Sequence, residues 1–252
     1  MTKKILALAL AAMMIFAFAG CAKEAADVDA AKLTVATNAE FPPFEYLENG
    51  EMVGAEIDMA YALAEKLGVE IEISNIDFDA ALTGAATGKY DMAISGITAN
   101  DERRKNMNFS DNYYMASQAI IVTADSEIAA AADLAGKTIS CQEGTTGEQY
   151  ILADENYKVQ SYKTGAEAIS ALVAGKVDAV VIDDAVARAL SEAQNGATKV
   201  LDEALTEEAY AIALELGDDE LTEKINGALA ELKAEGKLAE IFTEYGLPYD
   251  AE

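Results

Sequence analysis

Short apolar segments alternate with segments of helical periodicity along most of this chain, and that alternation limits the fold more than any other sequence feature. Segments typical of strands lie at residues 33–37, 70–73, 92–94, 119–122, 138–141, 159–162, 179–182 and 211–214. Segments typical of helices lie at residues 57–67, 80–87 and 165–174, and two more close the chain. Strands separated by helices pair in parallel, and such a sheet needs helices on both faces. The sequence therefore predicts an α/β protein.

The alternating pattern starts again in the middle of the chain. Residues 133–183 repeat the strand–helix–strand order of the first hundred residues, and no flexible Gly/Ser linker separates the two parts. We therefore expect two α/β lobes in close contact.

The first residues have the features of an export signal. Lys3 and Lys4 precede an apolar run over residues 5–18, and small residues follow before Cys21. The run is short for a hydrocarbon core of about 30 Å, although an uncleaved anchor helix is the alternative. Residues 18–21 resemble a bacterial lipobox, in which the cysteine becomes the lipidated first residue of the mature chain. We predict a signal peptide at residues 1–20, a lipidated (palmitate-bearing) Cys21 and a tether to residue 31, which anchor the protein outside the cell membrane or in the periplasm.

The composition excludes several classes of site. The chain has no histidine, which removes Ser-His-Asp and Cys-His catalysis, and its two cysteines, Cys21 and Cys141, cannot form a zinc cluster. We expect Cys141 to be a small buried hydrophobe. The formal net charge is −27 and is spread along the chain, so the surface repels nucleic acid and anionic lipid headgroups. We predict no catalytic residue, no cofactor, no metal and no nucleic-acid partner.

Five motifs carry a resemblance to a known family. They are TNAEFPPFEY at residues 37–46, ISGITANDER at 94–103, FSDNYY at 109–114, QEGTTGE at 142–148 and GKVDAVVID at 175–183. With these motifs in this order, residues 32–246 resemble the polar amino-acid binding proteins of ABC importers, which are solute-binding proteins of family 3 with the type II periplasmic-binding-protein fold. The resemblance implies two lobes, each a mainly parallel sheet flanked by helices, joined by two hinge strands. It also implies a discontinuous first lobe, residues 32–118 plus 210–252, around a second lobe at residues 119–209.

The resemblance assigns residues to the ligand's carboxylate. A zwitterion enclosed by a cleft needs donors for its carboxylate and acceptors for its ammonium, because unpaired buried charges are costly. Arg103 offers a planar fork that matches a carboxylate, and the backbone N–H groups of Thr98 and Thr146 are expected to complete the site. From its neighbours Arg104 and Lys105 alone, Arg103 is more typical of a surface arginine, and the preceding Ser-Gly-Ile-Thr motif reverses that preference.

The ammonium is assigned to Asp183, which directly follows an apolar strand, where α/β sheets place ligand groups. Asp184 is the alternative, although an acidic residue there also suits a helix N-terminus. A carbonyl of Ser95 or Gly96 and the Thr98 hydroxyl are expected to help Asp183.

Two rings match family positions that enclose the ligand's side chain. They are Phe41 and Phe78, which offer apolar walls and attract cations, whereas Phe44 is expected in the core. Asn38 stands where several relatives that bind basic amino acids have aspartate, and Glu45 and Glu143 are expected near the side-chain end. Polar neutral amino acids therefore rank first as ligands, cationic ones second and acidic ones last. The complete candidate set is Asn38, Phe41, Phe78, Ser95, Gly96, Thr98, Arg103, Glu143, Thr145, Thr146 and Asp183.

The predicted function is capture of a free polar L-amino acid by closure of the two lobes, followed by delivery to the membrane subunits of an ABC importer. We expect a monomer. Two alternatives share the fold: a dehydratase acting on prephenate-like cyclic acids, and a free-standing amino-acid sensor.

Overall fold

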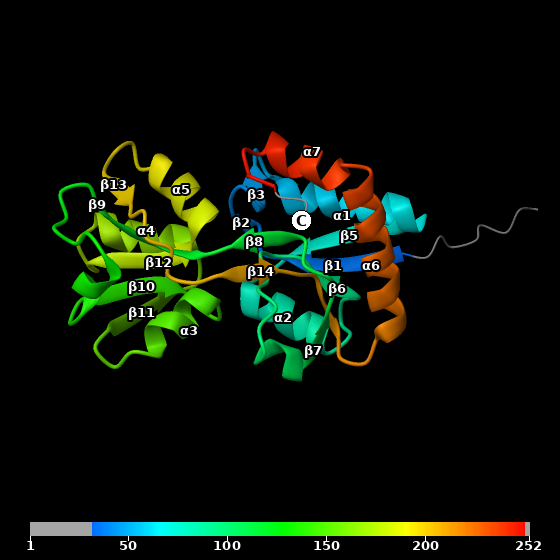
Figure 1. Cartoon of the computed structure of the whole chain (residues 1–252), viewed down its shortest axis with the longest axis horizontal. Coiled ribbons are helices and arrows are strands. Elements are labelled where there is room, and N and C mark those ends of the chain that lie inside the picture. Colours follow the sequence, from blue (N-terminus) through cyan, green and yellow to red (C-terminus); the bar gives the residue numbers. More distant parts are fainter. Residues whose placement is uncertain (1–31, 250–252) are drawn as a thin grey trace, which may run out of the picture. The chain divides into compact units, whose positions relative to one another are not determined.

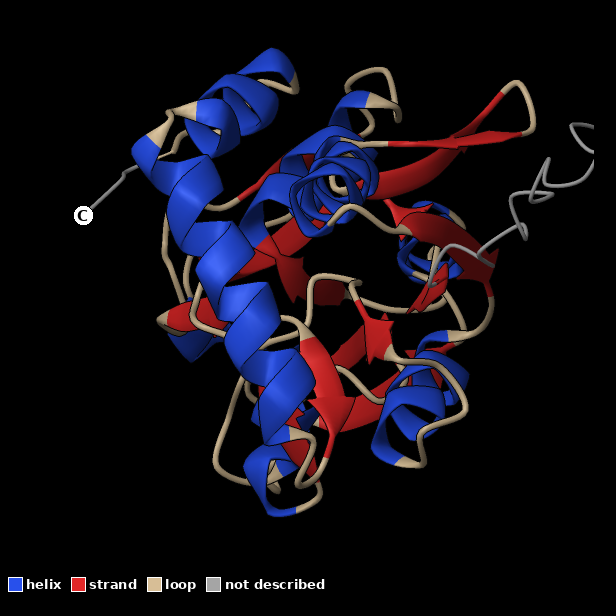
Figure 2. Cartoon of the chain, turned by 90° about the vertical axis from the view of Figure 1, so that its right-hand side faces the viewer, coloured by secondary structure: helices blue, strands red, loops and turns tan. Residues whose placement is uncertain are grey.

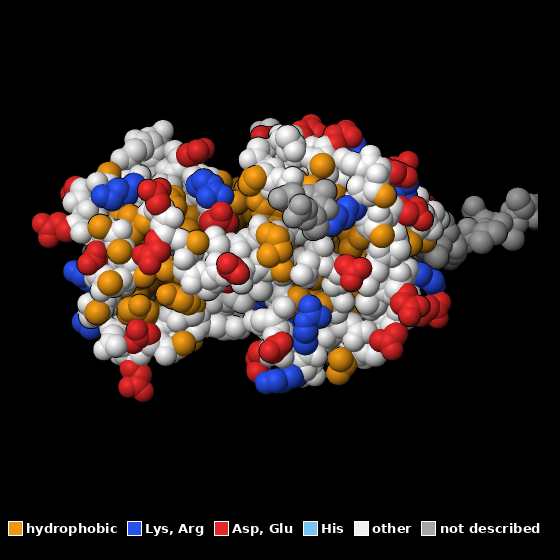
Figure 3. All heavy atoms as spheres, viewed as in Figure 1, with side chains coloured by type: hydrophobic (Ala, Val, Ile, Leu, Met, Phe, Trp, Pro, Cys, Tyr) orange, Lys and Arg blue, Asp and Glu red, His pale blue; other side chains and the backbone are white. Residues whose placement is uncertain are grey.

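The computed structural model describes residues 32–249 (Figure 1). The predicted signal peptide, Cys21 and the tether lie outside the described residues. Within the described part of the chain, no helix combines the length and the apolar character that a membrane span requires. Acidic side chains are scattered over the face seen in Figure 3, in agreement with the even spread of charge along the sequence.

One five-stranded sheet forms the core of the part that we call lobe 1. Its strands, in spatial order, are β5 (Glu70–Asn75), β1 (Lys32–Thr37), β6 (Met92–Ala93), β15 (Ala213–Glu215) and β7 (Met107–Phe109). Strand β1 pairs in parallel with β5 and β6, whereas β15 runs antiparallel to β6 and β7. Its helices are α1 (Ala55–Leu67), α2 (Phe78–Ala86), α6 (Asp219–Ala234) and α7 (Lys237–Glu244). Figure 2 views the molecule from the side of this lobe. A small antiparallel sheet adds β2 (Glu40–Phe41), β3 (Glu45–Glu48) and β4 (Glu51–Val53).

A second five-stranded sheet forms the core of lobe 2. Its strands, in spatial order, are β11 (Lys158–Tyr162), β10 (Thr138–Gln142), β12 (Ala179–Asp183), β9 (Gln118–Thr123) and β13 (Thr198–Val200). Strands β10, β11 and β12 are parallel, and β9 and β13 run antiparallel to their neighbours. The helices of this lobe are α3 (Thr146–Leu152), α4 (Gly165–Val173) and α5 (Asp184–Glu192). Two short 3-10 helices, Arg103–Lys105 and Ala131–Leu134, complete the elements.

Two strands join the sheets. Strand β8 (Tyr114–Ala116) leads into lobe 2, β14 (Glu208–Tyr210) leads back to lobe 1, and the two pair in antiparallel fashion (Figure 1). The predicted fold class, α/β with two sheets flanked by helices, is confirmed. Each sheet contains both parallel and antiparallel pairs. Strands β9 and β15 each follow directly from a connecting strand, without the crossover helix that parallel pairing of successive strands requires.

Most predicted elements appear close to their predicted positions. Gly68 ends α1 with φ 66°, the left-handed conformation expected just past a helix. The late strand predicted at residues 211–214 is displaced: β14 ends at Tyr210, and β15 begins at Ala213. Residues 211 and 212 lead from the connecting strand β14 into the sheet of lobe 1. Local strand propensity does not indicate that the chain changes its pairing partner there.

An aromatic cluster packs where the connecting strands meet lobe 1. Phe44 is fully buried, as predicted, and its ring meets Tyr114 and Tyr210 edge-on at 5.0 and 5.3 Å between centroids. Edge-to-face packing adds to the free energy gained by burial, so this cluster fixes the connecting strands against lobe 1. In lobe 2, Cys141 is also buried as predicted, and burial raises the pKa of its thiol to about 12.

Gly54 precedes α1, and the backbone of residues 44 and 45 packs closely against it. This close contact leads to a first prediction. The φ of Gly54 is 131°, and a Cβ there would lie 2.2 Å from the Phe44 carbonyl oxygen. We expect Gly54→Ala to lower the free energy of unfolding by about 3 kcal/mol or more, because neither backbone segment has room to move. Gly50→Ala is the matched control: φ is 89° and no atom lies within 4 Å, so it should cost about 1 kcal/mol. Equal costs in urea denaturation would contradict the steric argument.

Candidate functional site

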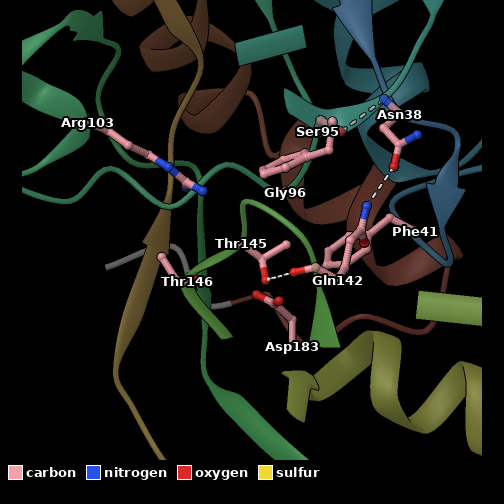
Figure 4. A pocket seen from close by; sticks show the side chains of 10 residues that line it. Asn38, Phe41, Ser95, Gly96, Arg103, Gln142, Thr145, Thr146 and Asp183 are labelled. Carbon is pink, nitrogen blue, oxygen red and sulfur yellow. Dashed lines mark hydrogen bonds between the residues drawn. The ribbon is translucent and has the colours of Figure 1, made fainter. Parts of the chain in front are cut away.

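A small cavity lies between the two lobes. Both lobes line it, and Figure 4 shows the side chains that point into it. The lining residues are Asn38, Phe41, Phe78, Ser95, Gly96, Arg103, Gln142, Thr145, Thr146 and Asp183.

The sheets explain why these residues meet. Asn38 follows β1, Ser95 follows β6, and Gln142 and Asp183 end β10 and β12. Parallel strands present their carboxyl ends at one edge of a sheet, and open α/β sheets bind ligands outside that edge. The two sheets turn these edges toward one cavity, so residues distant in sequence converge there.

Arg103 is buried at the wall of the cavity, with 6% of its surface exposed. Its Nη1 donates to the Thr98 carbonyl at 2.9 Å, and its Nη2 donates to the Gly144 carbonyl of lobe 2 at 3.1 Å. The guanidinium lies 5.5 Å from the centroid of the Phe78 ring. Burial lowers the pKa of Arg103, which the nearby carboxylates of Asp183 and Glu208 oppose. A guanidinium stays protonated at physiological pH, so the cavity has a fixed positive group.

Asp183 provides a buried acid on another side of the cavity, with 3% of its surface exposed. Its Oδ1 accepts from the Tyr210 hydroxyl at 2.6 Å. Burial, reinforced by the charge of Glu208, raises the pKa of Asp183 to about 7, although hydrogen bonds from Tyr210 and Gln118 oppose the rise. Asp184 instead forms an exposed ion pair with Arg188 at 2.7 Å, so the choice of Asp183 over Asp184 agrees with the geometry.

Two buried glutamates support the Ser95–Gly96 wall from behind. The Ser95 hydroxyl accepts from the Asn38 N–H at 3.0 Å and donates to Glu45 at 2.9 Å, while the Gly96 N–H donates to Glu56 at 2.9 Å. Burial raises the pKa of Glu45 well above its usual value. Glu45 therefore lies behind the cavity rather than at its lining, where the sequence analysis expected it.

Gln142 lines the cavity and was missed as a candidate. Its Nε2 donates to Asn38 Oδ1 at 3.0 Å, which links the lobes, while its Oε1 is buried without a partner among the described residues. The available signal was the position of Gln142, which ends β10 and opens the motif at residues 142–148. Asp183 in the same way ends β12, the strand that lies beside β10.

Two predicted residues do not line the cavity. Thr98 lies just outside it, where its carbonyl accepts from Arg103 and its hydroxyl donates to Glu208. Glu143 is half exposed and forms an ion pair with Lys163 at 2.7 Å. Glu143 belongs to the loop between β10 and α3, and its side chain lies along the surface.

The remaining predicted residues converge on the cavity. Phe41 and Phe78 lie in its lining, and Thr146 contributes from the start of α3. The Thr145 hydroxyl accepts from the Glu148 N–H at 3.2 Å and caps that helix. Within residues 32–249, no three His, Cys, Asp or Glu side chains are grouped to hold a metal ion.

Comparison with known proteins gives matches over almost the whole chain. Residues 33–248 match the model of the bacterial extracellular solute-binding proteins, family 3. The arginine-binding extracellular protein ArtP of Bacillus subtilis is 33% identical over 95% of this chain and 96% of its own. The ABC transporter arginine-binding protein 1 of Escherichia coli is 34% identical over 97% and 99%. The solved structure of an ancestral arginine-binding protein bound to glutamine is 42% identical, with a TM-score of 0.80 over 85% of this chain and 97% of that one.

The buried charge of Asp183 generates a second prediction. Its pKa is about 7 in the folded protein and about 4 when unfolded, so the folded state binds more protons between these pH values. The free energy of unfolding contributed by this group therefore falls as pH rises from 4 to 7. We expect Asp183→Asn, which keeps an acceptor for Tyr210, to stabilise the ligand-free protein by roughly 2–4 kcal/mol above pH 7.

Thermal unfolding of ligand-free wild type and Asp183→Asn at pH 4.5 and pH 8 measures this effect. The two proteins should differ little at the lower pH. A constant difference at both values would mean that Asp183 is not the titrating group.

Proposed function

The chain belongs to family 3 of the bacterial extracellular solute-binding proteins, and from this membership we propose that it captures one free L-amino acid between its lobes. The observation that carries the proposal is the pairing of Arg103 and Asp183 at one enclosed cavity, one from each lobe. A buried cation and a buried anion match the carboxylate and ammonium of an α-amino acid. The carboxylate of the ligand pairs with the positive charge of Arg103, and its ammonium pairs with the negative charge of Asp183.

The side-chain end of the cavity favours a ligand that donates hydrogen bonds. The unpaired Oε1 of Gln142 needs a donor, and Arg103 is the only lysine or arginine in the lining. An acidic side chain would find no second lysine or arginine among the described residues of the lining, so an acidic ligand is disfavoured. We therefore propose arginine first and glutamine second. The sequence analysis ranked polar neutral amino acids above cationic ones. Arginine is placed first here because Gln142 adds an acceptor and relatives of this chain are named as arginine-binding proteins.

Closure of the lobes is the proposed mechanism of capture. Hydrogen bonds cross between the lobes beside the cavity, among them those from Gln142 to Asn38 and from Arg103 to Gly144. Only a closed arrangement brings Arg103 and Asp183 to the same ligand, so binding stabilises closure by the ligand's higher affinity for that form. The connecting strands β8 and β14 are the proposed hinge between a lobe of residues 32–118 plus 210–252 and a lobe of residues 119–209.

Delivery to an ABC importer completes the proposal, since relatives of this chain serve such transporters. We further propose that a signal peptide directs export and that lipidation of Cys21 anchors the protein. We expect no dehydratase activity, and formation of product from a prephenate-like acid would contradict this.

A thermal-shift panel of the twenty amino acids tests the function. A ligand at a hundred times its Kd should stabilise the protein by about 2.7 kcal/mol, because it binds only the folded state. We expect arginine to give the largest increase in Tm, glutamine a smaller one, and aspartate and glutamate none. No shift with any of the twenty would overturn amino-acid capture.

Substitution of Arg103 tests the carboxylate site. Arg103→Ala should weaken binding of the ligand found in the panel by on the order of 3 kcal/mol, about a hundredfold in Kd, because a buried carboxylate loses its partner. Arg104→Ala is the control: this neighbour is exposed and lies over the Phe109 ring. Calorimetric titration should show less than a threefold change for the control. A similarly small change for Arg103→Ala would remove Arg103 from the site.

A further inference from the structure

Glu208 is a buried carboxylate on the connecting strand β14, with 7% of its surface exposed, and it does not line the cavity. Its Oε2 accepts from the hydroxyls of Thr98 in lobe 1 and Thr146 in lobe 2, the second at 2.7 Å. Its Oε1 accepts from the Thr206 hydroxyl at 3.0 Å. One acid thus holds a hydroxyl from each side of the ligand site.

These bonds fix the direction in which both hydroxyls interact. A hydroxyl has one hydrogen to donate, and an ionised carboxylate only accepts. The hydrogens of Thr98 and Thr146 are therefore committed to Glu208, and their oxygens are left as acceptors. An independent contact agrees, because Gln118 Nε2 donates to Thr146 Oγ1 at 3.3 Å.

The acceptor oxygen of Thr146 lies at the same end of the cavity as Asp183. Both residues line the cavity, and both hydrogen-bond with the Gln118 side chain. Figure 4 shows Thr146 and Asp183 on the side of the cavity below Arg103. This end therefore combines one carboxylate with a hydroxyl that can only accept, and an ammonium, which only donates, fits both.

We propose that Glu208 is a positioning residue that determines specificity: by holding the hydrogen of Thr146, together with that of Thr98 behind the lining, it keeps the Thr146 oxygen as an acceptor at the cavity and so favours a ligand with an α-ammonium. The proposal rests on the proposed function, since it concerns the same cavity. Glu208 touches the threonines and not the ligand, so it acts through their orientation.

Glu208→Gln tests this orientation with little change in shape. The amide has one donor nitrogen and one acceptor oxygen in place of two acceptor oxygens. Where the nitrogen faces Thr98 and Thr146, a hydroxyl hydrogen is released toward the cavity, where it opposes an ammonium. The probes are L-arginine and 5-guanidinopentanoate, which keeps the carboxylate and the guanidinium but lacks the α-ammonium. Competition against labelled L-arginine measures both dissociation constants, including the millimolar range expected for the analogue. We expect Glu208→Gln to weaken L-arginine by about tenfold and the analogue by less than about threefold.

Glu207→Gln is the matched control, because it removes one negative charge from an exposed neighbour and should change neither Kd. Equal weakening of both probes by Glu208→Gln would overturn the proposal and indicate a role in closure or stability alone. Unchanged binding of both probes by Glu208→Gln and by Thr146→Val would overturn it too. If Glu208→Gln does not fold, Thr146→Val removes the oriented oxygen and should show the same selective loss.

Failure of the proposed function gives a different result. Wild type that binds neither arginine nor any other amino acid rejects amino-acid capture before Glu208 is tested. If the panel identifies glutamine, L-glutamine and glutaramate replace the two probes, and the expected ratios are the same.

Discussion

The charges of Arg103 and Asp183 are buried at one cavity without an ion pair that cancels them. Arg103 is held by carbonyls and Asp183 by a tyrosine hydroxyl, and burial shifts both pKa values toward the neutral forms. Buried charges without an opposite charge beside them lower the free energy of unfolding of the ligand-free protein. A zwitterionic ligand offsets this loss by pairing with both charges. The residues proposed to bind the ligand are therefore among those whose buried charges destabilise the ligand-free protein.

The surrounding structure holds these charges in place. The glutamates behind Ser95 and Gly96, the cap at Thr145 and the aromatic cluster around Phe44 each fix one wall of the cavity. Connecting strand β14 contributes twice, because Tyr210 donates to Asp183 and Glu208 accepts from Thr98 and Thr146. Residues of the proposed hinge thus hydrogen-bond to residues around the proposed binding site, so we expect closure and recognition to depend on the same hydrogen bonds.

The sequence predicted features that depend on neighbours along the chain. The period of apolar residues indicated the strands and helices, Gly68 marked a helix end, and Asp183 was placed by the strand before it. The cavity lining was predicted largely through motifs at the ends of strands. Gln142 was missed although it ends a strand, because its contact with Asn38 joins residues that lie 104 positions apart.

By itself, the sequence determined the α/β class and the absence of histidine chemistry, because these follow from residue types and local period, whereas the residues that could hold a zwitterion were assigned through the resemblance to a family. Only the tertiary structure decided that Glu45 lies behind the cavity, that Glu143 faces solvent and that Gln142 has an unpaired acceptor inside. Glu208 had no local signal at all, since Thr98 and Thr146 lie 110 and 62 positions away. The direction of a hydroxyl depends on the acceptor that the fold brings to it, and no pattern along the chain contains that information.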